Sequence, residues 1–139
     1  IFGKRKQLRI LKVSAEQGPL ANLDIRKVTG GALLQTNDLI EEEPASWKVV
    51  TDRKPTEAEL KDMALAWKVS KHIKSNTIVL AKDGAMTGMG AGQPNRVTSV
   101  HLALRIAGDK AKGSVLASDA FFPFADNIEM AASGGVVAT

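Results

Sequence analysis

The sequence contains no cysteine, and its 139 residues include only two histidines, His72 and His101. The absence of cysteine excludes a disulfide framework, a thiol nucleophile and a zinc site built on cysteine ligands. Two histidines also argue against a metal centre held by several imidazoles. We therefore expect no bound metal.

Long hydrophobic runs are missing as well. The apolar stretches are a handful of residues long, whereas a membrane-spanning helix needs about 20. The basic start of the chain is not followed by the apolar stretch that a signal peptide carries. We therefore expect a cytoplasmic protein that does not bind a membrane.

The composition that remains is typical of a globular domain. Hydrophobic residues make up 44% of the chain and charged residues 24%, and 139 residues is the length of one ordinary domain. The chain begins at Ile1 rather than at a methionine, and residues 136–139 have the pattern of a strand that is just beginning. From these two features we expect a fragment of a longer protein.

Positive charge is concentrated at one end of the chain. The net charge is +4, but the first twelve residues contain five basic residues and no acidic one, and without them the net charge is −1. The five are Lys4, Arg5, Lys6, Arg9 and Lys12. Such residues protect a strand edge from pairing, or form an arm that contacts phosphates. We favour the first interpretation and expect no nucleic-acid partner.

Hydrophobic and β-branched runs predict strands, and turn residues separate them. The predicted strands or extended segments are residues 8–13, 23–28, 32–36, 47–50, 77–81 and 114–117. Asp83-Gly84 predicts a tight hairpin turn, after which the chain returns along residues 85–90. Residues 37–46 are predicted to form an acidic loop.

Helical spacing of apolar residues predicts three helices. The first begins at Thr56, which forms a capping-box pattern with Glu59, and should end near His72. The others are residues 96–107 and 126–133. The alternation of strands and helices predicts a layered α/β domain over residues 47–139, preceded by extended segments and the acidic loop in residues 1–46.

Glycines gather immediately before the second predicted helix. Gly88, Gly90 and Gly92 lead into its first turn, where Arg96 stands. Glycine lets backbone N–H groups approach an anion, and a helix N-terminus favours negative charge. The sequence matches neither a Walker A loop nor a dinucleotide-binding glycine motif. An anion site and a tightly packed turn therefore both remain open, and Arg96 is the candidate anion-binding side chain.

Polar donors gather where the first predicted helix meets the strand 77–81. Lys71, His72 and Lys74 can simply complement the negative C-terminal end of the helix, and we favour that interpretation for His72. Asn76 stands at the start of the strand, and its planar amide both donates and accepts hydrogen bonds. Asn76 is therefore the stronger candidate for a binding site.

Three of the four phenylalanines surround Pro123 ahead of the third predicted helix: Phe121, Phe122 and Phe124. They could form a stacking wall for a flat ring, with Asp126 accepting hydrogen bonds from ring N–H groups. Alternatively, the aromatic rings form a hydrophobic plug and Asp126 caps its helix. The sequence leaves both interpretations open.

Residues 71–79, 88–97 and 117–124 together strongly resemble AICAR transformylase, in order and in spacing. This transformylase is the C-terminal part of a bifunctional purine-biosynthesis enzyme whose N-terminal part is IMP cyclohydrolase. The resemblance extends from about Leu8 onward and covers only the later part of the transformylase. The adjacent residues Lys71-His72 are not the family's principal catalytic Lys-His pair, which lies upstream in the other subdomain.

The resemblance implies a cytidine deaminase-like three-layer α/β/α subdomain without zinc. It implies transfer of a formyl group from the co-substrate 10-formyltetrahydrofolate to AICAR nucleotide, in a homodimer or with a companion subdomain. Asn76 matches the residue that orients the amine, and Arg96 and Phe121 match residues that bind AICAR nucleotide. Val97 and Asp126 match positions that contact the folate.

Two expectations about activity follow from this resemblance. Without the family's Lys-His pair, the chain alone should be an inefficient formyltransferase. The alternative is a non-catalytic module that binds a nucleotide or a folate on the same scaffold.

Overall fold

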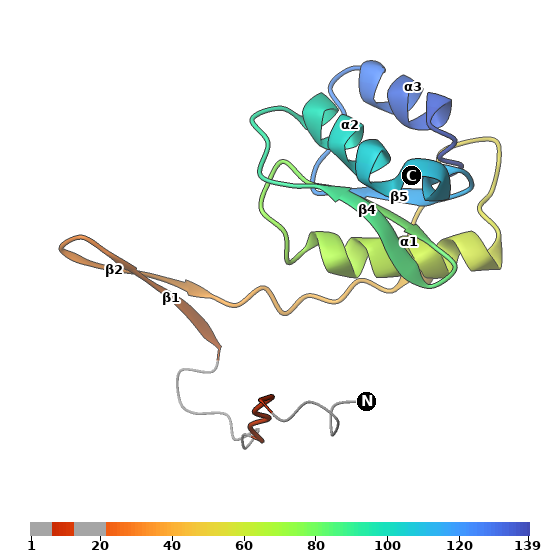
Figure 1. Ribbon diagram of the computed structural model, residues 1–139. Coiled ribbons are helices and arrows are strands. Elements are labelled where there is room, and N and C mark those ends of the chain that lie inside the picture. Colours follow the sequence, from red (N-terminus) through yellow and green to blue (C-terminus); the bar gives the residue numbers. More distant parts are fainter. Residues whose placement is uncertain (1–6, 13–21) are drawn as a thin grey trace. The chain divides into compact units, whose positions relative to one another are not determined.

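The computed structural model describes residues 7–12 and 22–139, and it divides the chain into two units (Figure 1). The first unit is Ile1–Glu41 and the second is Glu42–Thr139. The boundary predicted after Ser46 falls a few residues inside the second unit.

The first unit contains a β-hairpin. Strands β1 (Leu23–Val28) and β2 (Gly31–Thr36) pair antiparallel, so the predictions of strands over 23–28 and 32–36 are confirmed. The strand predicted over 8–13 is wrong for residues 8–12, which belong to no strand, and Val13 lies outside the described residues. The apolar side chains of Ile10 and Leu11 are exposed. An apolar run without a paired neighbour does not make a strand, because its backbone groups then have no ladder partners.

The second unit has a three-stranded antiparallel sheet between two helical layers. The central strand is β3 (Ile78–Lys82), flanked by β4 (Ala85–Gly90) and β5 (Val115–Ser118). Helix α1 (Glu57–Ser70) covers one face of the sheet, and α2 (Arg96–Ala107) and α3 (Asp126–Ser133) cover the other, as Figure 1 shows. The predicted α/β class and its three layers are confirmed.

Side chains of β3 alternate between two hydrophobic clusters. Ile78 and Leu80 pack with α2 and α3, whereas Val79 and Ala81 pack with α1. All four side chains are fully buried. The uninterrupted apolar run of β3 is thus explained by its central place, because both faces of this strand are covered.

The first predicted helix begins as expected. Thr56 is the N-cap of α1: its Oγ1 accepts a hydrogen bond from the Glu59 N–H at 3.2 Å, and the Glu59 carboxylate accepts one from the Thr56 N–H at 2.7 Å. The helix ends at Ser70 instead of near His72, because His72 and Ile73 already bond the carbonyl three residues back and so tighten the last turn.

The segment before α1 is less regular than predicted. Residues 47–50 belong to no strand, although the backbone of Trp47 is extended. The predicted acidic loop contains one short 3₁₀ turn, η2 (Pro44–Ser46). A second 3₁₀ turn, η3 (Gly108–Ala111), follows α2 and leads to β5.

The hairpin turn between β3 and β4 is confirmed. Asp83 and Gly84 both have positive φ angles, 53° and 73°. This is the conformation that two-residue hairpin turns require, and glycine adopts it without steric cost. Asp62 of α1 stabilises the turn, because its carboxylate accepts hydrogen bonds from the N–H groups of Asp83 at 2.9 Å and Gly84 at 2.7 Å.

Candidate functional site

Three chain segments meet at one edge of the sheet in the second unit. Ile78 of β3 lies opposite Ser118 of β5, so the residue before β3 and the residue after β5 are neighbours. Helix α2 begins at the same edge, and the side chain of its N-cap Asn95 accepts a hydrogen bond from the Thr98 N–H at 2.9 Å. The first helical residue, Arg96, is thereby placed next to the start of β3.

A guanidinium, an amide and a carboxylate form the centre of the site. Arg96 Nη2 donates hydrogen bonds to Asn76 Oδ1 and to Asp119 Oδ1, each at 2.8 Å. The Arg96 and Asp119 side chains are only 13% and 14% exposed. A charged pair removed this far from water is held in a fixed geometry, because either partner alone would be costly to bury.

The side chain of Asn76 is fixed by neighbours on both sides. Its backbone N–H and its side-chain Nδ2 both donate to the Gln93 carbonyl oxygen, at 3.1 and 2.9 Å. Its backbone carbonyl accepts a hydrogen bond from Ser99 Oγ at 2.7 Å. An amide has two N–H donors and two acceptor lone pairs. Asn76 therefore keeps one N–H and one lone pair with which it can bind a ligand that both donates and accepts.

Asp119 is a member of the site that the sequence did not single out. Its Oδ1 accepts a hydrogen bond from the Thr77 N–H at 3.1 Å, and its own N–H donates to the Thr77 carbonyl at 3.4 Å. Only the pairing of β5 with β3 brings these residues together, and a single sequence does not reveal which strands pair. The available signal was an acidic residue immediately after a short buried strand.

The ionisation of Asp119 follows from its surroundings. Burial favours the neutral form of the carboxyl group and works to raise its pKa. Hydrogen bonds from the Ser75 hydroxyl, the Arg96 guanidinium and the Thr77 N–H work in the opposite direction and prevail, so the pKa of this carboxyl lies below its ordinary value. The carboxylate therefore stays charged beside the guanidinium.

The aromatic cluster divides between two roles. Phe122 packs against the core cluster around Ile78, as the plug interpretation predicts, whereas the side chains of Phe121 and Phe124 are 80% and 73% exposed. The Phe121 carbonyl accepts a hydrogen bond from Arg96 Nη1 at 3.4 Å. The backbone of Phe121 is thus tied to the site while its ring stays available to a ligand.

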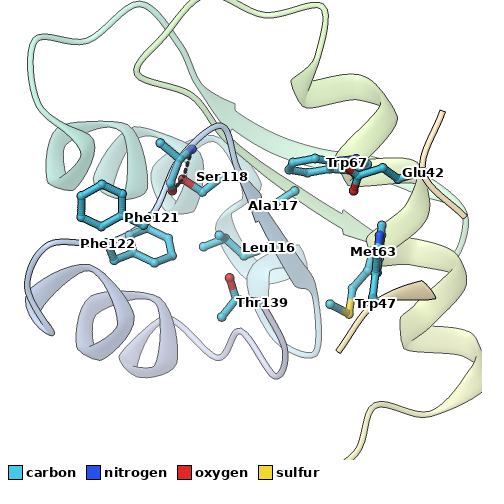
Figure 2. Close-up of a pocket in the computed structure, with 11 residues that line it drawn as sticks. Glu42, Trp47, Met63, Trp67, Leu116, Ala117, Ser118, Phe121, Phe122 and Thr139 are labelled. Atoms are coloured by element: carbon cyan, nitrogen blue, oxygen red, sulfur yellow. Dashed lines mark hydrogen bonds between the residues drawn. The ribbon is translucent and has the colours of Figure 1, made fainter. Parts of the chain in front are cut away.

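Phe121 also borders an apolar pocket of about 300 Å³ beside β5. Figure 2 shows Phe121 and Phe122 on one side of the pocket and Trp47, Met63 and Trp67 on the other. The two tryptophan rings meet edge to face, with centroids 6.4 Å apart. Flat apolar walls of this kind suit an aromatic ring or an apolar segment of polypeptide.

Two of the predicted ligand contacts lie outside the hydrogen-bonded cluster. Val97 follows Arg96 in α2 and is half-buried. Asp126 is exposed, and its Oδ1 accepts hydrogen bonds from the N–H of Asn127 at 2.7 Å and from Nδ2 of the same residue at 2.6 Å. The suggestion that Asp126 caps α3 is wrong, because Ala125 is the N-cap and Asp126 is the first helical residue.

The glycine cluster serves packing between β4 and α2. A Cβ atom at Gly88 would overlap the Ala103 carbonyl, and one at Gly90 would overlap the Ser99 carbonyl. The Gly92 N–H donates to the Lys74 carbonyl at 2.9 Å. These contacts favour the packed-turn interpretation over a glycine-lined anion cradle.

Arg96 retains a group that a ligand could use. Its Nε is buried and has no hydrogen-bond partner among the described residues. A buried N–H without a partner costs free energy, which an accepting oxygen or nitrogen would recover. In residues 7–12 and 22–139, no three His, Cys, Asp or Glu side chains are grouped to hold a metal ion, and no helix there is long and apolar enough to cross a membrane.

The fold and the site define a small α/β domain with a partly buried amide, guanidinium and carboxylate at one sheet edge. The sequence model of the family described as AICARFT/IMPCHase bienzyme matches residues 1–106. The chain belongs to this family, which confirms the resemblance to a bifunctional purine-biosynthesis enzyme.

Individual relatives agree with this assignment. The chain is 52% identical to the bifunctional purine biosynthesis protein of Dictyostelium discoideum, over 98% of the chain and 26% of that protein. It is also 52% identical to the corresponding protein of Thermoanaerobacter sp. and 48% identical to that of Listeria monocytogenes, in each case over 99% of the chain and 27% of the relative. The chain thus spans about a quarter of the length of these relatives.

Proposed function

We propose that this chain forms part of the formyl-transfer site of a bifunctional purine-biosynthesis enzyme. The substrates are AICAR nucleotide and 10-formyltetrahydrofolate, and the reaction takes place in the cytoplasm. The proposal rests on membership of the AICARFT/IMPCHase bienzyme family and on the geometry around Asn76 and Arg96.

The proposed reaction is an acyl transfer. The 5-amino group of AICAR nucleotide attacks the formyl carbon, a C–N bond forms, and a tetrahedral intermediate carries an oxyanion. The bond from the formyl carbon to N10 of the folate then breaks, and the proton lost by the amine goes to N10. Such a step requires an oriented amine, a proton acceptor and stabilisation of the oxyanion.

The residues of the central cluster are suited to orientation. The remaining lone pair on Asn76 Oδ1 can accept from the amine, and the remaining N–H on Nδ2 can donate to the neighbouring carboxamide oxygen. The unpartnered Nε–H of Arg96 can donate to the nucleotide. Phe121 offers an exposed ring to the base, and Val97 and Asp126 are the proposed contacts of the folate.

The rest of the bifunctional protein supplies the remaining groups of this site. We assign the proton acceptor to the Lys-His pair that the family resemblance places in another subdomain. A homodimer or a companion subdomain would then bring that pair to the cluster around Asn76.

The single observation that carries the proposal is the 2.8 Å bond from the Arg96 guanidinium to the Asn76 amide, which aligns both groups while each keeps bonding capacity. The test uses the complete bifunctional protein with Asn76→Ala or Arg96→Ala. We expect each variant to lose formyl transfer by about 100-fold or more, as removal of an orienting polar group does.

Arg105→Ala on the exposed side of the same helix is the matched control and should retain full activity. Ring closure of the formylated nucleotide to IMP is measured in parallel in every variant. Retained ring closure with lost formyl transfer would support the proposal. Lost ring closure with normal formyl transfer would assign the chain to the other activity. Tight binding of both substrates with normal formyl transfer in both Asn76→Ala and Arg96→Ala would also overturn the proposed function.

A further inference from the structure

We propose that Asp119 is a positioning residue that sets the orientation of the Arg96 guanidinium and, through it, of the Asn76 amide. This inference rests on the proposed formyl-transfer function. Asp119 need not contact either substrate.

The carboxylate of Asp119 joins all three segments that build the site. It follows β5 directly, it accepts the Thr77 N–H at the start of β3, and it accepts Arg96 Nη2 from the first turn of α2. The reciprocal bond from the Asp119 N–H to the Thr77 carbonyl fixes its backbone as well. Because β5 and this N–H bond hold the main chain of Asp119, its side chain has little freedom to follow Arg96 elsewhere.

The two hydrogens of Arg96 Nη2 are shared between Asp119 and Asn76, with equal distances of 2.8 Å. The carboxylate therefore decides the direction in which the second hydrogen points. That hydrogen is donated to Asn76 Oδ1, whereas the Gln93 carbonyl accepts a hydrogen bond from Asn76 Nδ2. Together these partners fix which end of the amide accepts and which end donates.

Charge is as important as shape in this arrangement. The guanidinium is always protonated in proteins, and here its side chain is only 13% exposed. Asp119 is the acidic partner that neutralises it in the structure. Without the carboxylate, the guanidinium would turn toward water or toward another acceptor, and the Asn76 oxygen would lose its donor.

The experiment compares Asp119→Asn and Asp119→Ala in the complete bifunctional protein. For Asp119→Ala, we expect kcat for formyl transfer to fall about 100-fold, as a misplacement of about 1 Å in a reacting group does. The KM for 10-formyltetrahydrofolate should stay within about twofold, because Val97 and Asp126, the proposed folate contacts, lie outside the hydrogen-bonded cluster of Asp119, Arg96 and Asn76. Asp119→Asn keeps an acceptor oxygen and the side-chain volume, so its kcat should be about tenfold higher than that of Asp119→Ala.

A double-mutant cycle separates positioning from a general loss of structure. If Asp119 acts through Arg96, the double variant Asp119→Ala/Arg96→Ala should be no slower than Arg96→Ala alone. Two independent losses that multiply would overturn the inference. Asp109→Asn on the exposed connection after α2 is the matched control and should leave all rates unchanged.

The melting curve reports whether each variant is folded, and ring closure to IMP reports whether the other activity of the protein is intact. If Asp119→Ala does not fold, the isosteric Asp119→Asn still tests the inference: a full kcat in that variant would overturn it, and so would a loss of kcat that multiplies with the loss of Arg96→Ala. Normal formyl transfer in Asp119→Ala, with large losses in Asn76→Ala and Arg96→Ala, would refute the positioning role alone. Normal formyl transfer in all of these variants would refute the proposed function itself.

Discussion

Arg96 and Asn76 lie 20 residues apart in the chain, yet the guanidinium of one donates to the amide oxygen of the other at 2.8 Å. The contact exists because α2 begins at the sheet edge where β3 starts. The same Nη2 group also reaches Asp119, and Nη1 reaches the Phe121 carbonyl. One planar cation thus connects an amide, a carboxylate and a backbone carbonyl.

This geometry predicts that Arg96→Lys is not a conservative change. Lysine keeps the charge, but its compact ammonium on a flexible stem lacks the planar fork and the Nε donor. We expect kcat/KM for formyl transfer in the complete protein to fall about tenfold to 100-fold, while the melting temperature changes little. Arg105→Lys on the exposed side of α2 is the control. Equal activity of Arg96→Lys and the unchanged protein would show that charge alone suffices.

The close approach of β4 and α2 predicts a second sensitive position, Gly90. A Cβ atom there would overlap the backbone of Ser99, and neither strand nor helix can move without disturbing the buried cluster. We expect Gly90→Ala to lower the opening free energy of β4 and α2 by about 1–3 kcal/mol, the cost of overpacking. Hydrogen exchange of peptides from these two elements measures the change.

Gly31→Ala is the matched control for that experiment. Gly31 also lies in a strand, but a Cβ atom at this position would meet no other atom within 4 Å, and its φ is not in the left-handed region. We expect exchange in β4 and α2 to be unchanged in this variant. Equal protection in Gly90→Ala and Gly31→Ala would mean that the interface between β4 and α2 can relax freely.

The sequence allowed the local features of the fold to be predicted, since their causes lie within a few residues. The capping box of Thr56 and Glu59 and the turn at Asp83 and Gly84 are of this kind. The role of Asp119 was not predictable in the same way, because it depends on the register of β5 against β3. The candidates Asn76 and Arg96 were found, but their direct contact required the same tertiary information.

The capping box predicts a pH-dependent stability of α1. Hydrogen bonds from the Arg53 guanidinium and the Thr56 N–H stabilise the Glu59 carboxylate and lower its pKa below the ordinary value of 4.5. A carboxyl group with a lowered pKa stabilises the folded state above its unfolded pKa, and this contribution disappears as the pH falls through the folded pKa. The first turn of α1 should therefore loosen below about pH 4.5.

Glu59→Gln tests this pH dependence, because glutamine can keep the capping geometry without the charge. We expect exchange at the start of α1 to be faster in Glu59→Gln than in the unchanged protein at about pH 6, well above the ordinary carboxyl pKa. The difference should shrink as the pH is lowered below about 4.5 and through the lowered pKa of Glu59, where this residue becomes neutral too. A difference that stays constant across this range would contradict the assignment of the stabilisation to the ionised carboxylate.

The hairpin turn predicts that Asp62 stabilises β3 and β4 from a different element. Its two carboxylate oxygens accept the N–H groups of Asp83 and Gly84, and these bonds link α1 to the turn. Asp62→Ala removes both acceptors and leaves the helix intact, because alanine favours helix. We expect the opening free energy of the hairpin to fall by about 1 kcal/mol, since the bonds are exposed to water.

Asp62→Asn gives the intermediate case, because its amide offers only one acceptor oxygen to the two N–H groups. Hydrogen exchange of the peptide that contains residues 82–86 should therefore rank the unchanged protein as the most protected, then Asp62→Asn, then Asp62→Ala. Asp109→Ala removes an exposed carboxylate far along the chain from this turn and should not alter the ranking. If all three proteins exchanged equally at the turn, the positive φ angles of Asp83 and Gly84 alone would suffice to hold the hairpin, and the contact with α1 would add no stability.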